Sequence, residues 1–366
     1  MKLRLANVSD DDALRALVRQ DAMPGWIRMA YGREPSFFHG LSVEGDFAQA
    51  FVFEDRTGEV RGQATRAIKR VWLDGEPTAV GYLGGLRIHP AARGSLGLAR
   101  GFAFLRRLHR DERCELYFTT ITTDNERAQA VLTSGRGGLP HYLPAGRVCF
   151  HAMAPSRLAR TMGRVGGLRV VTGATVGEAR MLAFFEEHGR AEQFFPRLGA
   201  GDLNAPQYRG LELDDFLVVL NTSGTIQGAA ALWDQRAYKQ LHVTGYAAPL
   251  AAAMPVARLG IRGLLGIELP RSGDELLLVY LAFPCIAEHD PAVLRALLGE
   301  AGQRLRTVGV HCLLAAWHQG HPLAQVDVGG LSYDSELYLV CWDEAITRCR
   351  ALLASRRPFH VEAATI

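Results

Sequence analysis

The sequence contains the same order of secondary-structure signals twice, and this repeat restricts the fold more than any other feature. Residues 50–66 (AFVFEDRTGEVRGQATR) and residues 216–232 (FLVVLNTSGTIQGAAAL) both show two apolar strand patterns joined by a polar turn. In both segments a turn glycine, Gly58 or Gly224, is followed four residues later by another glycine. The pattern predicts one β-hairpin in each half of the chain.

The segments that follow the hairpins also correspond. In the first half they are a strand (GYLGGLRIH), a helix (GLARGFAFLRRLHR) and a strand (CELYFTTI). In the second half ELLLVYLAF, PAVLRALLGEAGQRLR and HCLLAAW give the same order. This correspondence indicates a duplicated α/β unit of about 150 residues, and a chain of 366 residues is long enough for two such domains.

The predicted boundary between the two units lies at residues 154–167. This stretch carries Pro155, a glycine pair and basic residues, without strand periodicity. The first domain is therefore expected at 1–153 and the second at 168–366. An insertion at 248–273 has no counterpart in the first half, and its prolines, glycines and small apolar residues fit either a helical lid or a packed surface helix pair.

The first 46 residues suggest a strand, a helix and an aromatic loop. LRLANVSDDDALRALV fits a strand followed by an amphipathic helix, with Ser9 as its N-cap. Residues 21–46 are weakly periodic and rich in aromatic residues, which either line a ligand pocket or pack in the core. The aromatic residues of interest are Trp26, Tyr31, Phe37 and Phe38.

Composition excludes several classes of protein. With 48% hydrophobic and 22% charged residues the chain has an ordinary globular composition, and its net charge of +3 argues against a dominant nucleic-acid surface. No apolar run approaches the ~20 residues of a membrane helix. The N-terminus lacks the apolar core of a signal peptide, so the sequence predicts a cytoplasmic protein.

The cysteines and histidines do not form a recognisable motif. None of the six cysteines belongs to a CxxC pair, and Cys114, Cys285, Cys312 and Cys341 lie in apolar runs typical of core residues. The spacing of His318 and His321 in WHQGHP comes nearest to a metal-binding pattern. Because no acidic or cysteine partner lies nearby in the sequence, we interpret this segment as a polar loop and predict no metal site.

Residues 86–108 (LRIHPAARGSLGLARGFAFLRRL) predict a strand, a glycine-containing loop and a long helix. Pro90 ends the strand, and Gly94 and Gly97 frame the loop. Small residues before a helix allow successive backbone N–H groups to face one concavity, where the positive end of the helix dipole favours an anion. The segment therefore predicts a pyrophosphate site, although it matches neither the P-loop nor the dinucleotide-binding fingerprint.

This segment resembles the characteristic motif of the GNAT acyltransferase superfamily: a strand, His-Pro, Arg-Gly and a glycine turn that leads into a helix. TTDNERAQAVL is similar to a later motif of the family, in which Asn125 follows a strand and opens a helix with Ala128 three residues on. The element order across residues 1–150 also matches. The resemblance implies two tandem domains, each with a mixed, mostly antiparallel sheet flanked by helices.

The resemblance further implies acetyl-CoA or another acyl-CoA as the donor. Its pyrophosphate would bind the backbone amides of residues 94–99, and its pantetheine arm would pair like an added strand with the backbone near Leu86 and Ile88. An amine would attack the thioester while backbone donors polarise the carbonyl. The residues expected to bind the donor are Leu86, Ile88, Arg93, Gly94, Ser95, Leu96, Gly97, Leu98, Ala99 and Asn125.

Two departures from the family pattern affect the expected site. Between Arg93 and Gly97 there is one residue more than the family loop usually has. The tyrosine that often protonates the leaving thiolate is replaced by Thr133. Tyr142 and Tyr117 are the candidates to replace it in space; otherwise the thiolate leaves without a dedicated acid.

The second half lacks the glycine loop. CIAEHDPAVLRALL places Glu288 and Asp290 near the helix start, where two carboxylates would repel a pyrophosphate. This half is therefore expected to bind no CoA of its own, and either completes the acceptor pocket or stabilises the first domain. Residues 232–240 (LWDQRAYKQ) form a strand-like run and are a candidate for substrate contact or for the domain interface, with Asp234 and Lys239 as the charged groups.

The leading functional hypothesis is an acyl-CoA-dependent N-acyltransferase that transfers acetyl from acetyl-CoA to a small-molecule amine. A second hypothesis is transfer of an acyl or aminoacyl group from a tRNA or carrier protein, and a third is a CoA-binding sensor or scaffold without catalysis. No membrane or nucleic-acid partner is expected, and a homodimer remains open.

Overall fold

The computed structural model describes residues 2–20, 27–89, 95–136, 138–163, 165–248, 251, 260 and 270–366. Its strands are β1 (Lys2–Leu5), β2 (Ile27–Gly32), β3 (Phe47–Glu54), β4 (Val60–Leu73), β5 (Glu76–Ile88), β6 (Tyr117–Thr122), β7 (His141–Met153), β8 (Arg169–Thr172), β9 (Phe216–Leu220), β10 (Ile226–Trp233), β11 (Gln240–Tyr246), β12 (Leu278–Ile286), β13 (Cys312–His318) and β14 (Leu331–Cys341). Its α-helices are α1 (Asp11–Gln20), α2 (Phe37–Ser42), α3 (Ser95–His109), α4 (Glu126–Leu132), α5 (Pro155–Thr161), α6 (Gly173–Val176), α7 (Glu178–Gly189), α9 (Pro291–Val308) and α10 (Ile346–Ala354). Short 3₁₀ turns include η1 (Val8–Asp10), η6 (Ala287–His289), η7 (Pro322–Gln325) and η9 (Ala363–Thr365).

The repeat predicted from the sequence is present. Hairpins β3–β4 and β9–β10 are antiparallel, and their turn residues Gly58 and Gly224 have φ values of +85° and +81°, which favour glycine. In each half a parallel strand pair joined by a helix follows: β5 and β6 with α3, then β12 and β13 with α9. The prediction of a mixed, mostly antiparallel sheet flanked by helices is confirmed.

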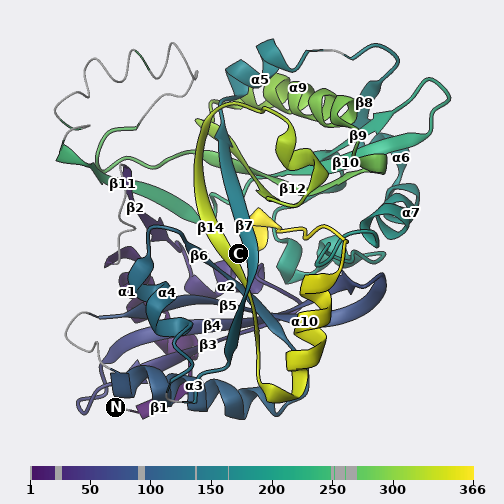
Figure 1. The fold of residues 1–366 in the computed structure, drawn as a ribbon. Coiled ribbons are helices and arrows are strands. Elements are labelled where there is room, and N and C mark those ends of the chain that lie inside the picture. The colour runs from purple at the N-terminus through teal and green to yellow at the C-terminus, as the bar shows by residue number, and fades with distance from the viewer. Residues whose placement is uncertain are drawn as a thin grey trace.

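The two halves share one continuous sheet. Twelve strands lie in the order β1-β3-β4-β5-β6-β14-β7-β13-β12-β10-β9-β8, while β2 and β11 form a separate pair. Strand β14 of the second half therefore lies between β6 and β7, and β7 of the first half lies between β14 and β13. Figure 1 shows β7 and β14 running together through the middle of the molecule. Each half thus contributes a strand to the other.

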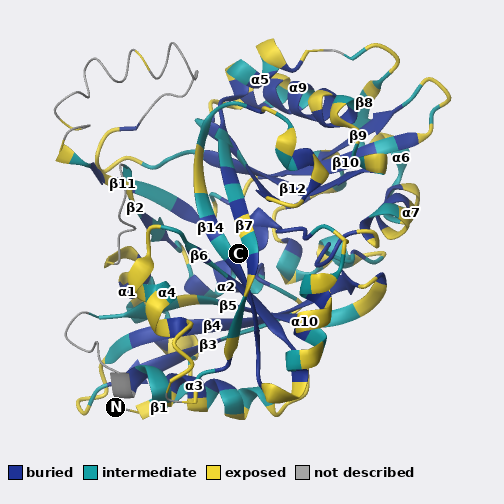
Figure 2. Cartoon of the chain, in the orientation of Figure 1, coloured by how far each residue is buried: buried dark blue, intermediate teal, exposed yellow. Residues whose placement is uncertain are grey.

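The sheet is buried on both faces in the second half. On β9, Phe216, Val218 and Leu220 pack in one hydrophobic cluster, whereas Leu217 and Val219 pack in another together with α9. Because successive side chains of a strand point to opposite faces, both faces of this strand are covered. Figure 2 shows buried residues concentrated on the central strands and exposed residues on the outer helices.

The predicted linker contains a helix. Within residues 154–167, α5 packs against α9, and a Cβ added at Gly302 would lie 2.5 Å from the backbone nitrogen of Ala159. Glycine at this position therefore permits the close approach of the two helices. The domain limits at 1–153 and 168–366 stay a prediction, and most of the predicted insertion at 248–273 lies outside the described residues.

Three local predictions are corrected. Ser9 lies inside the 3₁₀ turn η1 that precedes α1, and the N-cap of this turn is Asn7, whose Oδ1 accepts a hydrogen bond from Ser9 N at 2.9 Å. Residues 27–42, predicted as a loop, form β2 and α2. Residues 232–240, which resemble a strand, contain a turn between β10 and β11, where Asp234 forms an ion pair with Arg236.

The cysteines that were expected in the core are buried: Cys114, Cys285, Cys312 and Cys341. All six cysteines are free thiols. In the part of the chain that the structure describes, no helix combines the length and the apolar character that crossing a membrane requires.

Candidate active site

A cavity of about 350 Å³ opens where the parallel strands β5 and β6 separate. Their ladder consists of the pairs Gly81–Tyr117 and Tyr82–Phe118. Beyond these pairs the strands diverge, and residues 83–87 and 119–122 line the cavity walls. A separated strand edge of this kind is suited to pair with an extended ligand that enters like a further strand.

A β-bulge in β5 lies beside this opening. Gln63 pairs with Arg87 and Thr65 pairs with Gly84, so Gly85 and Leu86 together oppose one residue of β4. The side chain of Gln63 is fully buried and lines the cavity, and neither of its amide atoms has a hydrogen-bond partner among the described residues. An unpaired buried amide is costly, so this site is suited to a polar ligand group.

The start of α3 lies at the edge of the same cavity. Its residues Leu98, Gly101, Phe102 and Leu105 line the cavity wall. The first four N–H groups of a helix have no partner within the helix, and they lie at the positive end of its dipole. The first turn of α3 is therefore chemically suited to an anion such as a pyrophosphate.

The residues predicted to bind the donor have the following positions. Ser95, Leu96, Gly97, Leu98 and Ala99 belong to the first turns of α3, and among them Leu98 lines the cavity. Arg93 and Gly94 lie outside the described residues.

Three further donor-site predictions lie on β5 and at the start of α4. Leu86 and Asn125 line the cavity, whereas Ile88 pairs with Gly62 and does not belong to the described lining. Asn125 also caps α4, because its Oδ1 accepts a hydrogen bond from Ala128 N at 3.2 Å. The structure thus brings Leu86, Leu98 and Asn125 to one cavity.

The two candidate tyrosines differ in their access to this cavity. Tyr142 on β7 lines it and packs edge-on against Phe102, and burial raises the pKa of its phenol. Tyr117 is fully buried outside the described lining. Its hydroxyl accepts a hydrogen bond from Arg66 Nε at 3.0 Å. The position of Tyr142 is therefore compatible with proton transfer to a ligand, and that of Tyr117 with a structural role.

The second half of the chain contributes to the cavity wall. Tyr280 on β12 and Tyr333 on β14 line it together with Tyr31 and Tyr82 of the first half. Tyr333 stacks on Phe150 with ring centroids 4.7 Å apart. No local sequence signal identifies the second-half tyrosines, because they reach the cavity through the interleaving of strands.

A buried carboxylate, Glu44, also lines the cavity and was not identified from the sequence. Glu44 is 8% exposed, and its Oε2 accepts a hydrogen bond from Thr65 Oγ1 at 3.0 Å. Burial raises its pKa, and the nearby positive charges of Arg33, Lys239 and Lys69 oppose that rise. A carboxyl group with a raised pKa is suited to accept a proton near neutral pH.

Two buried lysines hold the C-terminal segment against this site. Lys69 Nζ donates a hydrogen bond to the carbonyl oxygen of Thr365 at 2.7 Å, and Lys239 Nζ donates to that of Ala364 at 2.9 Å. Burial lowers the pKa of Lys69 to about 8 and that of Lys239 to about 7. The neighbouring Ala363 belongs to the cavity lining.

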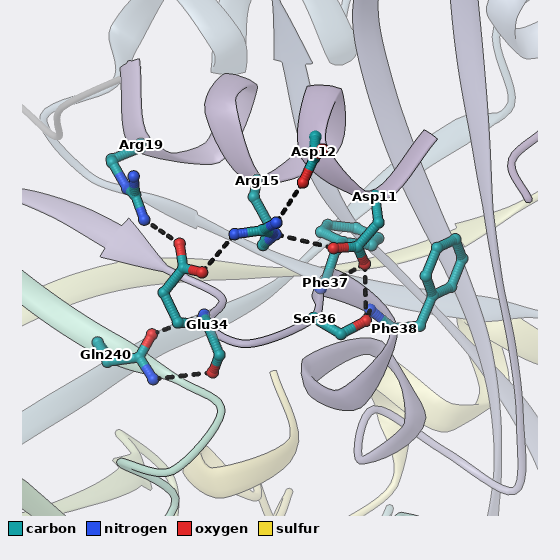
Figure 3. A network of polar contacts seen from close by, with 9 residues as sticks. All are labelled: Asp11, Asp12, Arg15, Arg19, Glu34, Ser36, Phe37, Phe38 and Gln240. Carbon is teal, nitrogen blue, oxygen red and sulfur yellow. Dashed lines mark hydrogen bonds and ion pairs between the residues drawn. The ribbon is translucent and has the colours of Figure 1, made fainter. Parts of the chain in front are cut away.

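A polar network fixes the wall formed by residues 31–38 (Figure 3). Gln240 of β11 holds the backbone of Glu34, accepting from its N–H at 3.0 Å and donating to its carbonyl oxygen at 3.1 Å. Asp11 of α1 accepts from Phe37 N at 2.9 Å, and Arg15 forms an ion pair with Glu34. The segment that carries Arg33 is thus held between α1 and β11.

The histidines of WHQGHP are buried and do not form the polar loop predicted from the sequence. His321 Nε2 lies 3.2 Å from Glu192 Oε1, and His289 Nε2 lies 3.1 Å from the same oxygen. His321 Nδ1 accepts a hydrogen bond from Leu323 N, so the imidazole proton resides on Nε2 and points to Glu192. These groups therefore form a hydrogen-bonded cluster. The atoms of Glu192, His289 and His321 that could each ligate a metal ion lie within 4.8 Å of one another.

No family model and no curated protein sequence matches the chain. The structure is similar to that of N-myristoyltransferase from Saccharomyces cerevisiae with bound myristoyl-CoA, with a TM-score of 0.58, 10% identity and coverage of 93% of this chain and 78% of that one. A GCN5-related N-acetyltransferase from Anabaena variabilis has a TM-score of 0.50 and 10% identity, covering 92% of this chain and 72% of its own.

A tandem GNAT protein from the clavulanic acid biosynthesis pathway has a TM-score of 0.50 and 14% identity, covering 92% of this chain and 98% of its own. Such similarity at low identity concerns the fold. The chain has a tandem GNAT fold, as the two sequence motifs predicted.

Proposed function

We propose that this protein is an acyl-CoA-dependent N-acyltransferase that transfers acetyl from acetyl-CoA to a small amine in the cytoplasm. The observation that supports this function most strongly is the cavity between the separated strands β5 and β6, with the start of α3 at its edge. In a tandem GNAT fold, this arrangement brings a helix start suited to an anion and a separated strand edge to one cavity, in which the reaction would take place.

The donor would bind along the first half of the chain. Its pyrophosphate would accept hydrogen bonds from the N–H groups of residues 94–99, and its pantetheine amides would pair with the open edge of β5 near Leu86. Gln63, whose amide has no described partner, would provide a further polar contact. The second half offers no equivalent loop, so one donor per chain is expected.

The reaction would then proceed in the chamber beyond β5. The amine nitrogen attacks the thioester carbonyl, forming a C–N bond while the C–S bond breaks. Glu44 would take the proton that the amine loses, and Tyr142 would donate a proton to the departing thiolate. Tyr280 and Tyr333 would form the acceptor wall, which gives the second half a role in binding the amine.

The proposal is tested by incubating the purified protein with acetyl-CoA and a panel of primary amines. Thiol release and the N-acetylated product, identified by mass spectrometry, should rise together in a 1:1 ratio. Thiol release without an N-acetylated product would indicate hydrolysis. Binding of CoA without thiol release for any amine would indicate a CoA-binding sensor and contradict the proposed catalysis.

A further inference from the structure

The acceptor end of the cavity contains two opposite charges that do not pair with each other. Arg33 and Glu44 both line the cavity. Glu44 accepts a hydrogen bond from Thr65, and Arg33 Nη1 donates to the carbonyl oxygen of Gly32 at 3.0 Å. Among the described residues, neither charge forms an ion pair with a side chain of the protein.

The two groups nevertheless lie close enough to interact electrostatically. Arg33 is the nearby charge that most strongly favours the ionised form of Glu44. The Arg33 guanidinium lies 5.3 Å from the ring centroid of Tyr31, another residue of the cavity wall, and this contact helps to orient it. A cation and an anion are therefore held in the wall of one cavity.

The surrounding charges show which kind of ligand suits this space. Lys69 and Lys239 also act on Glu44, and their ammonium groups donate to carbonyl oxygens of the C-terminal segment. Arg33, Lys69 and Lys239 thus lie around Glu44, and Glu362 also acts on the two lysines. A ligand with a second positive charge would be repelled here, whereas a ligand with one amine and one anionic group would meet complementary charges.

Uncharged hydrogen-bonding groups complete the lining. Three of the lining residues, Tyr31, Tyr280 and Tyr333, carry phenol hydroxyls. A phenol both donates and accepts a hydrogen bond, so these groups can contact either end of a zwitterion. An apolar acceptor would offer these hydroxyls no hydrogen bond.

We infer that the acceptor is an amino acid, with its amine beside Glu44 and its carboxylate bound by Arg33. This inference rests on the proposed function, because the same Glu44 would remove the proton of the attacking amine. Arginine suits the carboxylate, since its planar guanidinium can donate two parallel hydrogen bonds to the two oxygens.

The inference is tested with matched probes that differ in the carboxylate alone. α-, β- and γ-amino acids are compared with their decarboxylated amines and methyl esters. Calorimetry in the presence of CoA measures their binding, and thiol release from acetyl-CoA measures kcat and KM. The amino acids should bind about 10- to 100-fold more tightly than the amines without a carboxylate, as expected for a charge-assisted hydrogen bond.

Arg33→Gln should remove this preference: in calorimetry the amino acids should lose about 10- to 100-fold more affinity than the decarboxylated amines. Arg33→Lys should restore part of it. Arg28→Gln is the matched control, because Arg28 lies on β2 just before Arg33 in the chain, is exposed and does not belong to the cavity lining. Circular dichroism verifies that each variant is folded.

Equal binding of amino acids and decarboxylated amines, or an equal effect of Arg33→Gln on both, would overturn the inference and leave the proposed function standing. If no amine supports thiol release, the proposed function fails. The calorimetric comparison still decides the inference in that case, because binding of an amino acid through Arg33 does not require turnover.

Discussion

Replacing Glu44 by glutamine should slow acyl transfer strongly while preserving the cavity. The amide oxygen of glutamine can still accept the hydrogen bond from Thr65, which spans 3.0 Å in the structure. The substitution therefore removes the proton acceptor with little change in shape. General-base catalysis contributes about 10²- to 10⁴-fold to a rate, and kcat should fall by a factor in this range.

The pH profile provides a sharper test than the rate alone. Burial raises the pKa of Glu44, and the carboxylate accepts a proton once the pH exceeds this value. In the wild-type protein kcat/KM should therefore rise with pH through the pKa of Glu44, and the Glu44→Gln variant should lack this rise.

The free energy of unfolding should depend on pH in the opposite direction to kcat/KM. An acidic group whose pKa is raised by folding opposes folding when it is ionised, so wild-type stability should fall as the pH rises through that pKa. Glu44→Gln should therefore unfold at a higher urea concentration than wild type at neutral pH.

The control for this experiment is Glu76→Gln on β5, whose side chain is exposed and outside the cavity lining. It should leave both the rate and the pH profile unchanged. A Glu44→Gln variant with wild-type kcat and an unchanged pH profile would refute the assignment of Glu44 as the base.

Four other substitutions test separate parts of the structure. Gly97→Glu should abolish CoA binding in calorimetry with an unchanged circular dichroism spectrum, because a carboxylate in the first turn of α3 would repel the pyrophosphate; unchanged affinity would place the phosphates elsewhere. Tyr142→Phe should lower kcat. Tyr117→Phe should instead lower the free energy of unfolding by about 1–3 kcal/mol without a specific loss of kcat, because removal of the Tyr117 hydroxyl leaves its buried partners unsatisfied. The reverse pattern would exchange the roles of the two tyrosines. His360→Gln should lower the free energy of unfolding by about 3–5 kcal/mol, the range expected when one partner of a buried ion pair is removed.

The His360 prediction has a defined pH window. Burial opposes the charged form of His360, but hydrogen bonds with Glu192 and Glu362 outweigh burial and raise its pKa to about 9. The stabilisation should be complete below the unfolded-state pKa of about 6.5 and should be lost as the pH rises through about 9. Urea unfolding of wild type and His360→Gln should therefore differ more at pH 6 than at pH 10, and a constant difference would contradict this explanation.

Features encoded by local periodicity were predictable from the sequence. The hairpins β3–β4 and β9–β10 follow from alternating apolar residues around a glycine turn, and α3 follows from its helical spacing. The two motifs around residues 86–108 and Asn125 predicted the fold. In the structure Leu86, Leu98 and Asn125 line one cavity, and their role in donor binding stays a prediction.

Features that depend on strand partners were not predictable in this way. A strand's own residues do not specify which strand lies beside it, so the exchange of β7 and β14 between the halves left no local signal. Tyr333 reaches the cavity on the exchanged strand β14, and Tyr280 reaches it on β12 of the shared sheet. Glu44 and Gln63 likewise could not be identified from the sequence, because they become candidate site residues only through their burial where β5 and β6 separate.

The histidine cluster illustrates the same limit. Glu192, His289, His321 and His360 are far apart in the sequence, yet all three histidines contact the Glu192 carboxylate. Analysis of the WHQGHP segment alone therefore predicted a polar loop. The acidic partner lies more than a hundred residues earlier in the chain, where a search of neighbouring residues does not find it.

The central claim is that one acyl-CoA reaches a cavity built jointly by the two halves of the chain. The most direct test is an experimental structure of the protein with CoA. We expect one CoA per chain, with its pyrophosphate at the first turn of α3, its pantetheine arm along β5 and its sulfur facing Glu44. A CoA bound in the second half, or one whose sulfur lies outside the cavity, would contradict this claim.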